Sequence, residues 1–116
     1  MHVVRFDAAP PYAAPGHEGM RMVRLQGREA GPADLVWLGV STIEPGGGAA
    51  LSASEVEKMY VVLDGEVTLS NGETEIRLGP LDSCRIAPRE GRILRNDTRA
   101  VARILLAMPF APTPAR

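Results

Sequence analysis

The side chains best suited to binding or catalysis lie in the middle of the chain, between residues 46 and 96. Because strand side chains alternate between two faces, residues two apart in an extended segment point the same way. This alternation predicts one pocket that contains two cations, two hydroxyls, a phenol and a thiol: Lys58, Arg92, Ser52, Ser54, Tyr60 and Cys84. Two cations and several donors inside an apolar enclosure suit a small carboxylate or phosphate.

Lys58 is also the strongest candidate for covalent or proton-transfer chemistry. An amine that is desolvated beside another cation has a lowered pKa, so it could act as a base or form an imine with a carbonyl substrate. The alternative interpretation is structural: Lys58 pairs with Glu44, Glu55 or Glu57, and the pocket is neutral.

The other candidates also have structural interpretations. Arg92 could reach the mouth of the pocket and stay hydrated. Cys84 is expected to be a small buried apolar residue, since no histidine lies near it in sequence to activate the thiol. Tyr60 could be a core residue with a bonded hydroxyl, and Ser52 and Ser54 could bond to the backbone. The two histidines of the chain, His2 and His17, precede this region and are expected to be exposed.

The elements that position these residues are short strands separated by turns. Apolar or alternating segments are expected at 35–43, 56–63, 66–70, 73–78, 83–87, 93–96 and 100–108. A break is expected at Pro45–Gly48, and Asp64-Gly65 and Asn71-Gly72 each predict a hairpin turn. No segment shows a sustained helical period, so the fold class is predicted as all-β, an antiparallel sandwich or barrel.

Residues 1–34 are predicted to form an arm, residues 35–108 the barrel, and residues 109–116 a loose tail. Pro10, Pro11 and Pro15 exclude a helix in the arm, and residues 20–25 could form one strand. We expect the arm to lie across the body of the domain or across a neighbouring subunit; a partly disordered tail is the alternative. Trp37 is assigned to the core or to a subunit interface.

Composition limits the class of protein. The apolar share of 45% over 116 residues indicates one globular domain, and the net charge of −1 argues against nucleic acid or an anionic membrane as the main partner. One cysteine excludes an internal disulfide and suits a reducing compartment. No secretion signal pattern precedes the domain, so a cytoplasmic location is the expectation.

Two stretches carry a resemblance to a known family. EPGGGAALSASEVEKMYVVLDGEVTL and LGPLDSCRIAPREGRILRND resemble the two conserved motifs of the cupin superfamily, in the form of a small single-domain cupin with a type-2 conserved barrel. The turn and strand framework matches from Gly46 to Gly65 and from Gly79 to Asn96. The resemblance implies an antiparallel double-stranded β-helix, the jelly-roll barrel.

The metal-ligand positions of those motifs do not match. The three histidine positions fall on Ser52, Ser54 and Arg92, and the glutamate position falls on Lys58. Cupin metals are held by imidazoles and a carboxylate, so we predict no metal and no other cofactor. One alternative stays open: a one-residue bulge would turn Glu57 inward in place of Lys58, with His17 delivered by the arm.

The residues and the resemblance together lead to two hypotheses. The first is a barrel that binds a small organic anion through Lys58 and Arg92. The second is a metal-independent isomerase, lyase or epimerase in which Lys58 or Tyr60 moves a proton. A metal-dependent dioxygenase is disfavoured by the missing imidazoles. The apolar arm and the resemblance to single-domain cupins also predict a homodimer.

Overall fold

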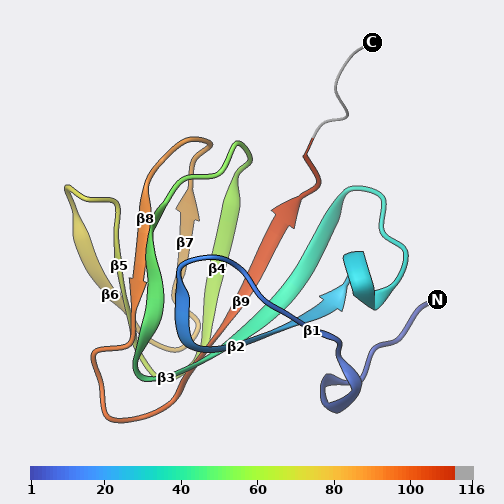
Figure 1. The fold of residues 1–116 in the computed structure, drawn as a ribbon, viewed down its shortest axis with the longest axis horizontal. Helices are drawn as coiled ribbons and strands as arrows, with labels where there is room; N and C mark the ends of the chain where they lie inside the picture. Colours follow the sequence, from blue (N-terminus) through green and yellow to red (C-terminus); the bar gives the residue numbers. More distant parts are fainter. Residues whose placement is uncertain (112–116) are drawn as a thin grey trace.

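The computed structural model describes residues 1–111, which form an antiparallel barrel of nine strands and two short 3-10 turns (Figure 1). The strands are β1 (Pro11–Tyr12), β2 (His17–Gln26), β3 (Val36–Ser52), β4 (Lys58–Asp64), β5 (Val67–Ser70), β6 (Glu75–Leu78), β7 (Ser83–Ile86), β8 (Arg92–Arg95) and β9 (Ala102–Pro109). The 3-10 turns are η1 (Phe6–Ala8) and η2 (Arg28–Ala30). The predicted all-β antiparallel barrel is confirmed. None of residues 1–111 belongs to a helix long and apolar enough to cross a membrane.

The long strand β3 joins the two halves of the barrel. The strand order is β6-β5-β8-β3-β9-β4-β7, with β2 also paired to β3. The first part of β3 pairs with β9 from Val36 to Ile43, and the last part pairs with β8 from Gly48 to Ser52. The two halves therefore face each other across a common interior.

The break expected at Pro45–Gly48 is wrong, because β3 runs through this segment to Ser52. The backbone here packs closely against β8: Gly46 N–H donates to Asn96 O at 2.8 Å, and Asn96 N–H donates to Gly47 O at 2.9 Å. A Cβ atom on Gly48 would lie 2.0 Å from the carbonyl oxygen of Leu94. The glycines thus permit close strand contact, where the sequence pattern indicated a turn.

The two predicted hairpin turns differ in outcome. Asn71-Gly72 does join the paired strands β5 and β6, although the loop spans four residues and the Asn71 side chain accepts the N–H groups of Glu73 and Thr74. Asp64-Gly65 is not a hairpin turn, since β4 pairs with β7 and β9 while β5 pairs with β6 and β8. The chain instead crosses between the halves there. Gly65 has a φ of +75° and a backbone too close to Val101 O for a side chain.

The core fills the interior between the two halves. Its most enclosed side chains are apolar and come from five strands: Ile43, Val62, Val67, Leu94 and Ile104. Full burial of such a side chain stabilises the fold by about 1.5–3 kcal/mol. Along β4 the buried positions alternate with more exposed ones, so Lys58, Tyr60 and Val62 all point inward. That alternation follows the sequence prediction.

The N-terminal arm packs on the body of the same chain. Strand β2 pairs antiparallel with β3 from His17 opposite Ala49 to Gln26 opposite Leu38, and β1 adds to the outer side of β2. The tail predicted at 109–116 lies mostly outside the described residues. Within them, Pro109 still belongs to β9 and Phe110 N–H donates to Leu35 O at 3.2 Å.

Candidate functional site

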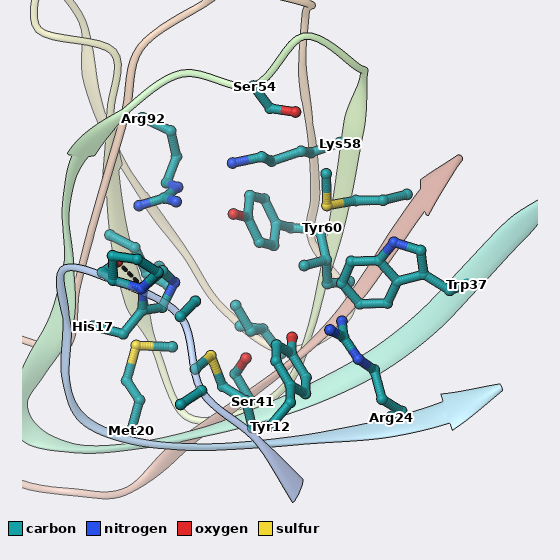
Figure 2. A pocket seen from close by; sticks show the side chains of 18 residues that line it. Tyr12, His17, Met20, Arg24, Trp37, Ser41, Ser54, Lys58, Tyr60 and Arg92 are labelled. Carbon is teal, nitrogen blue, oxygen red and sulfur yellow. Dashed lines mark hydrogen bonds between the residues drawn. The ribbon is translucent and has the colours of Figure 1, made fainter. Parts of the chain in front are cut away.

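A cavity of about 280 Å³ lies between the barrel wall and the arm (Figure 2). Its lining side chains come from β3, β4, β8 and β9 on the barrel and from the arm: Tyr12, Ala13, Ala14, Pro15, His17, Met20, Met22, Arg24, Trp37, Ser41, Ser54, Lys58, Tyr60, Arg92, Leu94, Ile104, Leu106 and Met108. Three of these residues are cations, and within residues 1–111 no Asp or Glu belongs to the lining. The cavity is therefore an apolar enclosure with a positive electrostatic potential.

Lys58 enters the cavity from the first position of β4 and is 7% exposed. None of its proposed carboxylate partners reaches it. The Glu57 side chain pairs with Arg85, Glu55 lies 3.9 Å from Arg89, and no ion pair to Lys58 is present within the described part of the chain. Burial, reinforced by the nearby charge of Arg92, lowers the pKa of Lys58 from 10.5 to about 8.

Arg92 enters from the first position of β8 and is 3% exposed. Its guanidinium donates to Ala50 O and to Ser52 Oγ, each at 3.1 Å. Its Nε has no hydrogen-bond partner among residues 1–111. A guanidinium carries five N–H donors, so donor capacity remains on a side chain that is held in place by two bonds. Arg92 is not the hydrated residue at the mouth that one interpretation of the sequence foresaw.

Tyr60 is 4% exposed, and in Figure 2 its ring lies beside Lys58 with the hydroxyl directed toward the side of Arg92. Burial raises the pKa of the Tyr60 phenol, and the charge of Arg92 acts in the opposite direction. The phenol therefore stays protonated at neutral pH and can donate a hydrogen bond or a proton into the cavity.

The remaining predicted residues divide between the cavity and its surroundings. Ser54 lines the cavity, and its Oγ accepts the Val56 N–H at 3.1 Å. Ser52 is exposed and does not belong to the lining, but its hydroxyl holds Arg92.

Cys84 packs against the core on the same side of the sheet as Tyr60, but it does not belong to the lining of this cavity. Although it is opposite Tyr60 in the β4–β7 register, Cys84 lines a separate groove formed with residues of β5 and β6. Strand β7 is the last strand of the order, and the groove that Cys84 lines also includes Arg85 and Ile86 of β7. Burial and the Glu90 carboxylate raise the pKa of the Cys84 thiol, which opposes thiolate chemistry.

The arm supplies lining residues that the sequence did not assign to the site, apart from His17, which was placed there only in the alternative with an inward Glu57. The guanidinium of Arg24 lies between two aromatic rings, 3.4 Å from the Tyr12 centroid and 4.3 Å from the Trp37 centroid. It also pairs with Glu29 at 3.1 Å. His17 lines the cavity as well and donates through Nδ1 to Pro15 O at 2.8 Å, so it is less exposed than expected. The only signal in the sequence was the short apolar run from Met20 to Leu25.

The donors at this site do not suit a transition-metal ion. The family ligand positions hold Ser52, Ser54, Lys58 and Arg92. Serine hydroxyls are weak ligands, and protonated ammonium and guanidinium groups repel a cation and offer no free lone pair. The alternative with Glu57 turned inward is not what β4 adopts, since Lys58 is the buried residue and Glu57 pairs with Arg85.

Comparison with known proteins supports this fold. Residues 39–108, more than half of the chain, match the family model for the cupin domain. A protein of Mycobacterium tuberculosis named Beta-D-galactosidase Rv1717 is 41% identical over 113 residues, which cover 96% of this chain and 97% of that protein.

Solved structures with lower sequence identity share the architecture. The polyketide cyclase RemF of Streptomyces resistomycificus has a TM-score of 0.83 at 21% identity, with 94% of this chain and 79% of that chain covered. A predicted oxalate decarboxylase of Thermotoga maritima has a TM-score of 0.80 at 19% identity, with 96% and 100% covered. These likenesses concern the fold alone. With the domain match and the full-length relative, they show that the chain belongs to the cupin family.

Proposed function

We propose that the cavity binds a small organic molecule with a carboxylate or phosphate group, which lies between Lys58 and Arg92. The observation that carries this proposal is the pair of cations, 7% and 3% exposed, that share an enclosure with no acidic side chain from residues 1–111. A buried charge without a counter-charge costs free energy, and a bound anion would offset that cost with charge-assisted hydrogen bonds.

The size and walls of the cavity support a small organic ligand over an inorganic ion alone. A volume of about 280 Å³ is near the lower end of ordinary ligand sites, which are roughly 300–1,000 Å³. Leu94, Ile104 and Leu106 provide apolar contacts for a carbon skeleton, and Tyr60 and Ser54 provide hydroxyls for orientation. The proposed ligand therefore combines an anionic group with an uncharged body.

Calorimetric titration with a set of small carboxylates and phosphates tests the proposal. Arg92→Met should weaken binding of any anion that the wild-type chain binds, because it removes the fixed charge. Arg77→Met is the matched control, since Arg77 is an exposed arginine on β6. Equal affinities for the wild type and Arg92→Met, with both folded by circular dichroism, would contradict the proposal.

Hydrolysis of β-D-galactosides is a second candidate function, favoured by the 41% identity to the protein named Beta-D-galactosidase. Most glycosidases use two carboxyl groups about 5–9.5 Å apart, whereas the described lining offers none. Galactoside hydrolysis in this cavity would therefore depend on Tyr60 and Lys58 for nucleophilic attack or proton transfer. The same two residues would serve a metal-independent isomerase, lyase or epimerase.

A chromogenic β-D-galactoside distinguishes these candidates. Turnover that disappears in Tyr60→Phe and Lys58→Met but survives in Arg77→Met would favour the enzyme. Absence of turnover together with anion binding would favour the binding protein.

A further inference from the structure

Lys58 is the only lysine in the chain, and the other twelve of its thirteen Lys and Arg residues are arginines. All the remaining Lys and Arg positions hold arginine, and the one side-chain amine lies in the cavity. Arginine would supply charge at least as well, but it cannot lose its proton at physiological pH and become a nucleophile. The identity of residue 58 therefore points to chemistry of the amine, in addition to its charge.

We infer that Lys58 forms an imine with the carbonyl carbon of a 2-oxo acid whose carboxylate is held by Arg92. This inference rests on the proposed anion site and names its substrate class. Arg92 is anchored by Ala50 O and Ser52 Oγ, whereas no ion pair within residues 1–111 holds the amine of Lys58. One cation is thus fixed for binding, and its neighbour is free to react.

The surroundings favour the neutral amine that the reaction requires. The enclosure and the charge of Arg92 both disfavour the ammonium form, and the pKa of Lys58 is lowered to about 8. An amine in that range has a substantial neutral fraction near pH 7–8, while an exposed lysine has almost none.

The reaction needs no oxidant or additional reagent. The lone pair of the neutral Lys58 Nζ attacks the carbonyl carbon, and the π electron pair of the C=O bond moves to oxygen, which takes up one of the two protons of the amine. The carbinolamine that results loses its hydroxyl as water while a C=N bond forms. Tyr60 lines the same cavity with a phenol that burial keeps protonated, so it can donate a proton to the departing hydroxyl and then take up the remaining proton of the nitrogen.

Reductive trapping tests the inference on the intact chain. The protein is incubated with pyruvate or 2-oxoglutarate and cyanoborohydride, and the adduct is located by intact-mass and peptide mass spectrometry. We expect one adduct, at Lys58, and a labelling rate that falls about tenfold or more in Arg92→Met, because a charge-assisted contact to the carboxylate is lost. Tyr60→Phe should slow trapping, because it removes the proton donor for the departing hydroxyl.

Two matched variants test separately how the cavity, the positive charge and the amine group of Lys58 contribute to labelling. Arg77→Lys adds an exposed amine on β6, which should be labelled much more slowly than Lys58. Lys58→Arg retains the cation without an amine nucleophile, so it should bind lactate, the reduced analogue of pyruvate, and form no adduct at position 58. Labelling at position 77 of Arg77→Lys as fast as that of Lys58 would overturn the inference.

The measurements distinguish a cavity that binds anions without forming an imine from a cavity that does not bind anions. If lactate or 2-hydroxyglutarate binds in calorimetry and binding weakens in Arg92→Met, but neither oxo acid is trapped at Lys58, the imine inference is overturned and the anion site stands. If no adduct forms, and neither these acids nor any other member of the carboxylate and phosphate set binds, both proposals are overturned.

Discussion

The arm end of the cavity has one partly buried cation and the barrel end has two buried ones, but only the arm end has a counter-charge. At the arm end, Arg24 lies between the rings of Tyr12 and Trp37 and pairs with Glu29. At the barrel end, Lys58 and Arg92 face the interior with no acidic partner from residues 1–111 (Figure 2). A cation with a counter-charge contributes to the stability of the fold. Buried cations without a counter-charge lower that stability, and binding of an anion would offset the loss.

The largest difference between the two ends should appear in the stability of Lys58→Met. The fall in the Lys58 pKa from 10.5 to about 8 corresponds to a folding penalty of up to about 3 kcal/mol at pH 7. Between pH 8 and pH 10.5 the unfolded chain holds a proton that the folded chain has lost, so wild-type stability rises with pH in this window. Lys58→Met should therefore be more stable than wild type at pH 7, and this advantage should shrink toward pH 10.5.

Urea denaturation of both proteins at about pH 7 and about pH 10 measures this effect. The comparison uses the difference between variant and wild type, which cancels the titration of the other groups. A stability difference that does not change with pH would mean that the Lys58 amine is not desolvated in the folded chain.

Arg92→Met should give the next largest effect, on ligand affinity. Loss of a charge-assisted contact should weaken binding of a small carboxylate by about 10- to 100-fold. Arg24→Met removes a cation from the other end of the same cavity and should change affinity much less, because that charge is already compensated. Equal losses in both variants, measured by calorimetry, would remove the distinction between the two ends.

Arg24→Met should instead lower stability, by about 1–2 kcal/mol, since it removes two cation–π contacts. Arg21→Met on the same strand is the matched control, because Arg21 is exposed. Thermal or urea unfolding measures both variants. If the two variants are equally stable, Arg24 does not hold the arm against the barrel.

The smallest effect is expected for Ser52→Ala, which removes the hydroxyl that accepts a hydrogen bond from Arg92. One net hydrogen bond is worth about 1 kcal/mol, so the affinity for an anion should fall about fivefold while Arg92 itself remains. Ser83→Ala, at an exposed position of β7, is the control. Unchanged affinity in Ser52→Ala would show that Ser52 does not position Arg92.

Local patterns explain which features of the barrel end could be predicted. Alternation along one strand correctly turned Lys58, Tyr60 and Val62 inward, because a strand has only two faces and the apolar one must be buried. Asn71-Gly72 marked a true hairpin for a similar local reason.

Features that depend on distant pairing were not accessible in the same way. Asp64-Gly65 has the composition of a hairpin turn, yet β4 and β5 pair with other strands, so the chain crosses between the halves. Cys84 follows the predicted alternation along β7 and lies opposite Tyr60, yet it lines a groove with β5 and β6 residues and not the cavity of Lys58. Neither outcome follows from the residues nearby in sequence.

Periodicity and residue identity are local properties, and they were enough to predict the antiparallel barrel and to place Ser52, Ser54, Lys58 and Arg92 at the positions that resemble the metal ligands of cupins. That the arm lines the cavity and that Arg24 has a counter-charge depends on the three-dimensional fold, because the pairing of β1, β2 and β3 brings the aromatic rings and Glu29 to Arg24. The fold also decided that Lys58 has no acidic partner among residues 1–111, since Glu57 turns outward to Arg85. Charge balance depends on distances in space, and those are set by strand pairing across the whole barrel.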